Sequence, residues 1–379
     1  TASVTLSILD GLERGQFQGT GHLDIELAGT VRDPKLTGAV LVSDLVYQKS
    51  AKAVLRLEHL LAQMEWQGHQ LTVLESEARW ARGILFTQAK IDLVTSNIAL
   101  STNFESIDLR SAIREAGGHR NSWTTFLGDG DIQATGTLSP FRMTGIYEVA
   151  LQDLDVRTGA PDNKAASSVL RMPTIELEGK LEVDPSGIWL RSERVRSGDT
   201  SGSIDAFIGF TRTGPLDIKY DLDRTSLSSF RPLRDLDLWG FGRLYGTVKG
   251  PFREIRLTAG ARLRDFRMLG AKLADKVSTE MVCNDLKTLE FTRFGGELGA
   301  TTFLGHADVS IKQSTTLDIG IEVVDGRVED LLEIGGEAVP GVAGRISGIV
   351  NLNGEPDALN GDFDAELRDV HLLGEQFPS

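Results

Sequence analysis

The most regular feature of the sequence is an alternation of apolar and polar residues with a period of two. Between 215 and 223, every second residue is apolar and those between are mostly charged. The stretches 22–28, 174–183, 203–210, 316–324 and 362–368 follow the same pattern. Successive side chains of a strand point to opposite faces, so each stretch predicts a strand with one apolar face. Such strands are typical of antiparallel sheets, because buried parallel strands have nearly continuous apolar runs.

The apolar positions of these stretches predict the lining of a shared apolar surface. They are Leu23, Ile25, Leu27, Ile175, Leu177, Ile204, Ile208, Phe210, Leu216, Ile218, Tyr220, Leu222, Leu317, Ile319, Ile321, Val323, Phe363 and Leu367.

Helical spacing is rare. The segments 106–117 and 328–335 predict short helices, and 225–236 is a third candidate that Pro232 weakens. The segment 51–63 has the composition of a helix but alternates in part, so both interpretations stay open for it. The chain is therefore predicted to be all-β with few short helices.

A motif recurs four times, at 21–45, 130–154, 242–266 and 344–370. Each copy opens with a Gly-led strand, continues through a turn with one proline, and closes with a strand that ends in Asp and an apolar residue. The prolines, Pro34, Pro140, Pro251 and Pro356, are 106, 111 and 105 residues apart, which indicates a repeat of about 107 residues. We expect about eight to ten short strands and one helix per repeat. The four prolines should lie in turns on one rim, because proline cannot donate to a central ladder.

The number of strands limits the architecture. At roughly 12 residues per strand and turn, the chain would hold on the order of 30 strands. A row of separate sandwiches or barrels and one continuous curled sheet would both bury a single apolar face. Because no clear linker separates the repeats, we expect one elongated segment over 1–379. Its sheet would be long, twisted and antiparallel, and would curl into a trough with its apolar face inside.

Composition excludes some classes of protein. Hydrophobic residues make up 40% of the chain, enough for a core. The net charge of -14 argues against nucleic acid as a partner. The single cysteine, Cys283, is expected to be a small buried residue. No apolar run reaches 18 residues, and the chain begins with Thr1. We interpret it as an excised segment or mature fragment, with any targeting or anchoring element outside it.

The sequence contains no clear candidate for a catalytic residue. The closest histidines, His59 and His69, are ten positions apart, and no metal-ligand spacing occurs. The run 128–131, Gly-Asp-Gly-Asp, is single and predicts a plain turn. Arg191, Arg194 and Arg196 predict an ion-paired patch on an outer face. We expect no enzyme activity, no cofactor and no metal.

The four motifs resemble the AsmA-like family of bacterial envelope proteins, and within it the TamB-like members. The first two copies read Gly29-Thr30, Pro34, Leu36, Gly38, Asp44-Leu45 and Gly136-Thr137, Pro140, Met143, Gly145, Asp153-Leu154. The third, with Gly246-Thr247, Pro251, Leu257, Gly260 and Asp265-Phe266, is looser. The fourth, with Gly354, Pro356, Leu359, Gly361 and Asp369-Val370, lacks the threonine.

The resemblance implies a repeating β-groove, that is, a long, continuous, taco-shaped groove with an apolar interior. It would bridge the periplasm of a Gram-negative bacterium, in a protein anchored in the inner membrane. It implies a conduit for phospholipids between the inner and outer membranes, with acyl chains as the ligand. It also implies a role in outer-membrane protein assembly, with a partner of the outer-membrane barrel-insertase superfamily that would bind through regions outside this segment. Two alternatives stay open: a periplasmic scaffold or chaperone for autotransporter assembly, and a structural β-array with closed cores.

Overall fold

The computed structural model divides into two units, residues 1–198 and 199–379, and each is described by itself. The described residues are 16–30, 33–48, 54–108, 110–112, 124–157, 168–209, 215–229, 237–251, 255–268, 270–284, 288–311, 315–334, 341–356, 358–372 and 375–377. Phe210, one of the predicted lining residues, lies outside them.

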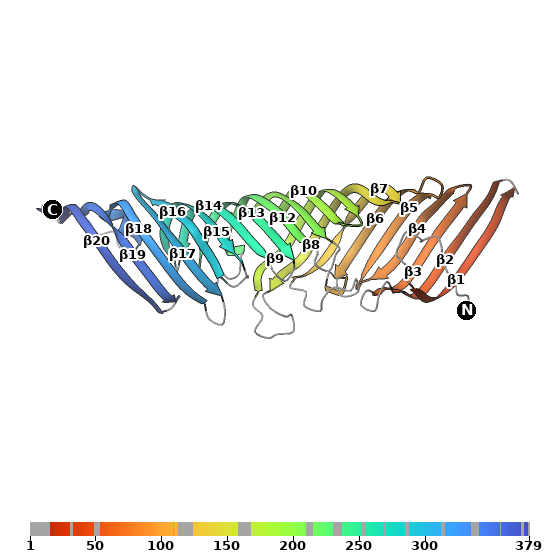
Figure 1. Cartoon of the computed structure of the whole chain (residues 1–379), viewed down its shortest axis with the longest axis horizontal. Helices are drawn as coiled ribbons and strands as arrows, with labels where there is room; N and C mark the ends of the chain where they lie inside the picture. The colour runs from red at the N-terminus through yellow and green to blue at the C-terminus, as the bar shows by residue number, and fades with distance from the viewer. Residues whose placement is uncertain are drawn as a thin grey trace. The chain divides into compact units, whose positions relative to one another are not determined.

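The first unit is an antiparallel sheet in which each strand pairs with the next along the chain (Figure 1). Its strands are β1 (Gln16–Thr30), β2 (Asp33–Gln48), β3 (Val54–Gln67), β4 (Gln70–Trp80), β5 (Gly83–Asp92), β6 (Asn97–Asp108), β7 (Thr124–Leu138), β8 (Phe141–Arg157), β9 (Ser168–Asp184) and β10 (Gly187–Ser197).

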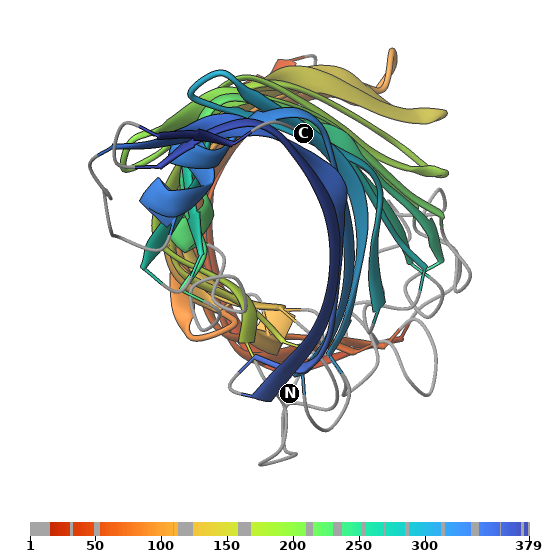
Figure 2. The ribbon, with the colours of Figure 1, turned by 90° about the vertical axis from the view of Figure 1, so that its left-hand side faces the viewer.

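The second unit continues the same pattern of sequential antiparallel pairs. Its strands are β11 (Thr200–Gly209), β12 (Pro215–Ser226), β13 (Trp239–Pro251), β14 (Arg256–Met268), β15 (Ala271–Cys283), β16 (Thr288–Leu298), β17 (Thr301–Ile311), β18 (Thr315–Arg327), β19 (Val342–Glu355), β20 (Ala358–Leu372) and β21 (Glu375–Phe377). In Figure 2 its strands, from green to dark blue, follow an arc.

These pairings confirm the predicted all-β, twisted antiparallel sheet within each unit. The strand count was overestimated, because the strands are longer than the typical value: β8 and β9 have 17 residues each and β2 has 16. Long strands suit a sheet that curls, since each one crosses the arc obliquely. That residues 1–379 form one continuous segment stays a prediction.

The four sequence motifs lie on the strand pairs β1–β2, β7–β8, β13–β14 and β19–β20, so the repeat has six strands and not eight to ten. Pro140 and Pro356 lie in the turns, Pro34 is the second residue of β2, and Pro251 ends β13. Successive turns of a meander alternate between two rims. The connections between the motif's two strands are six strands apart within each unit and therefore share a rim of that unit, but Pro34 and Pro251 lie at strand ends and not in turns as predicted.

The aspartate of each motif lies in a β-bulge, and this corrects the expectation that it ends a strand. Asp44, Asp153, Asp265 and Asp369 have φ angles of 53°, 53°, 52° and 52°. In each pair the register skips one residue on the first strand and two on the second. Asp tolerates left-handed backbone better than most residues. Because bulges bend a strand and raise its twist, the motif places a bend at every sixth strand.

The helical predictions have mixed outcomes. The helix at 328–335 is confirmed as α3 (Val328–Ile334). Of 106–117, the first three residues belong to β6, 110–112 are helical and the rest lie outside the described residues. Of 225–236, only the 3₁₀ turn Leu227–Ser229 follows the end of β12, and 230–236 are not described. The described part of the ambiguous segment 51–63 is strand β3, since its alternation outweighs its composition.

Candidate functional site: the apolar face of each unit

The register of unit 2 places the predicted lining residues on one face. Residues directly opposite each other in an antiparallel pair point to the same face. Ile208 is opposite Leu216, and Ile204 is opposite Tyr220, so β11 and β12 share an apolar side. The same relation, followed strand by strand through β19, joins this side to Leu317, Ile319, Ile321 and Val323 of β18 and to Phe363 and Leu367 of β20.

Unit 1 has an equivalent apolar face. Leu23, Ile25 and Leu27 of β1 are opposite Val40, Gly38 and Leu36. The register carried through to β9 places Ile175 and Leu177 on this same side. All seventeen described residues of the predicted lining therefore lie on the apolar face of their own unit.

Sequence reasoning missed much of this face, because glycines and bulges interrupt the alternation of β13–β17. Gly246, for example, occupies an apolar-face position between Leu244 and Val248. Only the register identifies these positions. In unit 2 they include Ala206, Leu244, Val248, Leu257, Ala259, Ala261, Leu263, Val277, Met281, Cys283, Leu289, Phe291, Phe294, Phe303, Ala307, Val309, Ile346, Val350, Leu352, Leu359 and Ala365.

Exposure varies along the apolar face. Ile204, Ile218, Ile319 and Ile321 are half-buried. On β1 and β20 the lining is open to solvent: Leu27 is 73% exposed and Phe363 is 64% exposed. Apolar side chains on the inside of a curled sheet shield one another, whereas those at its ends have neighbours on one side only. The face is thus water-accessible over part of its length.

One part of the face is closely packed. Leu263, Val277 and Phe303 belong to a buried cluster, and Val328 and Leu331 of α3 pack against it. Phe294 contacts Phe303 at a ring-centroid distance of 5.7 Å. The Phe303 ring lies over Gly296, where a Cβ would come within 2.3 Å of it. Cys283 is also buried on this side, as expected.

Few polar atoms reach the apolar face. Some of them have partners, whereas the buried hydroxyl groups of Thr225 and Thr279 have none among the described residues. The Tyr220 hydroxyl donates to the backbone carbonyl of Thr258 at 3.3 Å, and burial raises the pKa of this hydroxyl to about 12. The hydroxyl groups of Tyr147 and Ser192 are 2.5 Å apart, and those of Thr87 and Thr102 are 3.2 Å apart. Neutral groups of this kind leave the face apolar.

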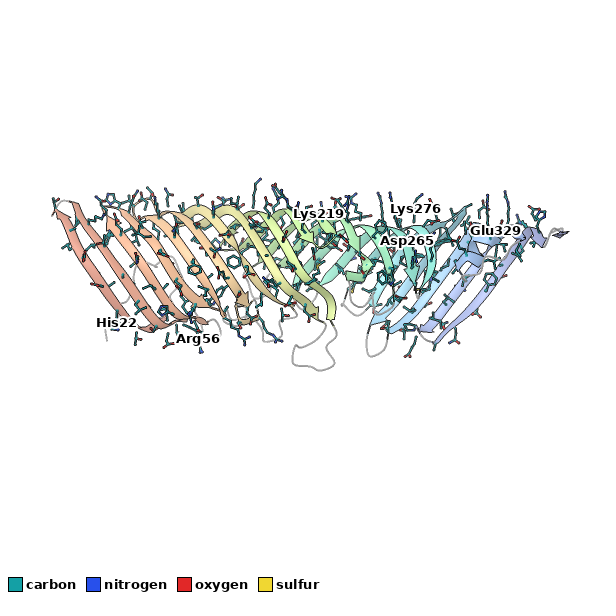
Figure 3. All side chains as sticks on the ribbon, turned by 180° about the vertical axis from the view of Figure 1, so that it is seen from behind. His22, Arg56, Lys219, Asp265, Lys276 and Glu329 are labelled. Atoms are coloured by element: carbon teal, nitrogen blue, oxygen red, sulfur yellow. The ribbon has the colours of Figure 1, made fainter. Side chains whose placement is uncertain are left out.

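The outer face is charged, and cross-strand ion pairs neutralise part of this charge. Lys219 and Lys276 project from it (Figure 3). Lys249 pairs with Asp217 at 3.1 Å and Lys276 with Glu297 at 2.8 Å. Arg243 donates to both carboxylate oxygens of Asp221 and lowers the pKa of that carboxyl.

The predicted arginine patch lies on the outer face of β10, as expected. Arg194 pairs with Glu178, while Arg191 and Arg196 are opposite Lys180 and Glu176. The run 128–131 is part of strand β7, and not the turn that the sequence predicted. Its Asp129 accepts hydrogen bonds from the Ser106 amide and the Gln152 side chain, so local β pairing uses its oxygens.

The described residues contain no group of three or more His, Cys, Asp or Glu side chains placed to hold a metal ion. Within the same residues, no helix has the length and apolar composition needed to cross a membrane. The arrangement can offer an apolar surface to a ligand. We find no match between this chain and any protein-family model, curated protein or solved structure.

Proposed function

We propose that the apolar face binds phospholipid acyl chains and conducts them along the sheet, between the inner and outer membranes of a Gram-negative bacterium. The observation that carries the proposal is the register, which aligns apolar side chains from strand to strand on one face of each unit. Each methylene group that leaves water for such a surface gains about 0.8 kcal/mol. A continuous lining lets a chain slide without crossing a polar barrier.

The sequence resemblance supports the same proposal. The protein would be an AsmA-like protein most similar to TamB, lie in the periplasm, and be anchored in the inner membrane through another part of the polypeptide. A partner of the outer-membrane barrel-insertase superfamily would bind outside this segment. No chemical step is required, so the proposed protein is not an enzyme and uses no cofactor.

Site-specific photocrosslinking tests the proposal with a matched pair of neighbours. A photoreactive residue at Ile218 would lie on the apolar face, and one at Lys219 would lie on the outer face. In cells, we expect lipid adducts at 218 and none at 219, and native mass spectrometry of purified protein should show bound phospholipid. Equal labelling at both positions, or no lipid in either measurement, would refute the proposal and favour the closed-core β-array.

A separate observation favours a second function, that of a scaffold for outer-membrane proteins. Strand β1 pairs with β2, and no partner for its other edge occurs among the described residues. It has 15 residues, and Leu23, Ile25 and Leu27 are at least half exposed. An open edge of this length suits strand addition. Crosslinking of β1 to unfolded outer-membrane protein would support this function, and Leu23→Pro should then remove the crosslink.

A further inference from the structure

On the outer face of unit 2, two arginines of β14 lie directly opposite cations of the neighbouring strands. Arg262 is directly opposite Arg243 of β13, and Arg264 is directly opposite Lys276 of β15. Like charges directly opposite each other in an antiparallel pair destabilise a sheet. This arrangement therefore costs stability, in a chain whose net charge is -14.

The neighbouring cations are neutralised, but two arginines are not. Arg243 pairs with Asp221 and Lys276 pairs with Glu297. Neither Arg262 nor Arg264 has a carboxylate within ion-pairing distance in the part of the chain that the structure describes, and both are exposed. Two guanidinium groups are thus left without a counter-charge in the described residues, next to cations that have one.

The two arginines line a shallow hollow of about 670 Å³ across β14–β18. Its opposite side is apolar: Leu304 is 58% exposed and Val324 is 54% exposed. Gly295 is among the lining residues between these sides, and Leu304 lies over it, where a Cβ would come within 3.0 Å of the Leu304 side chain. The hollow therefore has unpaired cations on one side and exposed apolar side chains on the other, with the Lys276–Glu297 ion pair on the strands between them.

We propose that this hollow binds an extended acidic peptide segment of a partner protein. Arg262 and Arg264 are two positions apart on one strand, so their side chains are roughly 7 Å apart. Carboxylates two positions apart on an extended peptide have the same spacing. The intervening residue of such a peptide points the other way, and apolar residues further along can contact Leu304 and Val324. The positive charge of the two arginines thus favours an acidic partner, and their spacing along the strand favours an extended conformation of the bound peptide.

An anionic membrane surface is a poorer fit for the hollow. The protein carries 54 acidic and 40 basic residues, so a broad anionic bilayer would meet net repulsion. A short peptide presents only a few charges to a local cationic patch. The hollow lies on the outer face, so the inference does not depend on lipid binding by the apolar face.

The test measures binding of a fluorescent nine-residue peptide that alternates Glu with Val and Leu, by anisotropy, to the full chain. The R262Q/R264Q variant should bind about tenfold or more weakly, since two charge-assisted contacts are lost. The control variant K219Q/R256Q removes the same charge elsewhere on the outer face and should bind as the parent does. Binding should weaken as salt increases.

Three further measurements decide between interpretations. R262Q/R264Q should melt at the same or a higher temperature, because it removes like-charge contacts; a lower one would make these arginines structural residues and overturn the inference. L304S should weaken peptide binding while both arginines remain. Binding to vesicles of phosphatidylglycerol, lost in R262Q/R264Q and not competed by the peptide, would assign the hollow to a membrane surface and also overturn it.

Discussion

The carboxylate of Asp330 on α3 accepts a hydrogen bond from the Thr301 hydroxyl at 2.8 Å and another from the Thr301 amide at 3.0 Å. The amide of Ala300 donates to the same oxygen at 2.9 Å. Thr301 is almost fully buried and its hydroxyl oxygen accepts from the Arg327 amide. These bonds fix α3 on the β16–β17 turn, and they hold Val328 and Leu331 against the apolar cluster.

Removal of this carboxylate should loosen α3. In Asp330→Ala, the amides of Ala300 and Thr301 lose their acceptor, at a cost of about 1–3 kcal/mol. The control is Glu329→Ala, because Glu329 makes one long bond of 3.3 Å to the Gly344 amide. Chemical denaturation followed by circular dichroism should show a clear loss for the first variant and a much smaller one for the second. Equal losses would mean that the bonds at Thr301 do not hold the helix.

The bulge aspartates should respond to substitution according to backbone conformation. Asp153 has a φ of 53°, which glycine adopts freely and valine does not. We expect Asp153→Gly to leave stability nearly unchanged and Asp153→Val to cost about 1–2 kcal/mol. Thr144→Val on the same strand, at an exposed position with ordinary backbone, should be close to neutral. If glycine at 153 destabilised as much as valine, the aspartate side chain and not its backbone would matter.

The sequence identified the strands with unbroken alternation and little else about their arrangement. In β12, no glycine occupies an apolar-face position between Leu216 and Leu222. The same holds in β18 between Leu317 and Val323, so the alternation alone identified the apolar positions of both strands. In β16, the bulge between Phe291 and Phe294 changes the phase, and Gly295-Gly296 removes two side chains. There the apolar face depends on cross-strand register, which a period-two pattern cannot supply.

The recurring Asp also shows where sequence reasoning reached its limit. Its position in the motif indicated a repeat, but its role depends on a left-handed φ and on a skip in the register, which for Asp265 lies between Trp239 and Phe241. The predicted number of strands per repeat was too high for a related reason. A typical strand length was assumed, while strands such as β8 run for 17 residues.

Stability above pH 9 should depend on Tyr220. Burial raises the pKa of its hydroxyl from 10.0 to about 12 in the folded state. Between these values the unfolded chain ionises first, so the contribution is complete below pH 10 and is lost as the pH rises towards 12. The loss should be about 1 kcal/mol near pH 11.

Urea denaturation of the parent and of Tyr220→Phe at pH 8 and pH 11 isolates this effect, because the other tyrosines contribute equally to both. The parent should lose more stability than the variant over this interval. An identical loss in both proteins would show that the hydroxyl is already accessible to water in the folded state.

The last prediction compares two neighbouring positions on the apolar face of β18. Leu317 is 6% exposed, whereas Ile319 is half-buried. Leu317→Asp places a carboxylate among packed side chains and should cost several kcal/mol, on the order of the desolvation of an unpaired polar group. Ile319→Asp leaves the charge within reach of water, so the thermal unfolding temperature should fall much less.

The folded Ile319→Asp variant then tests conduction itself, because a charge interrupts the apolar path. Photoreactive residues in place of Phe291 on β16 and Phe363 on β20 would lie on either side of β18. If acyl chains move along the face, lipid labelling at one of these two sites should drop while labelling at the other persists. Undiminished labelling at both sites in a folded variant would contradict a conduit, and unfolding of Ile319→Asp as severe as that of Leu317→Asp would indicate a closed core.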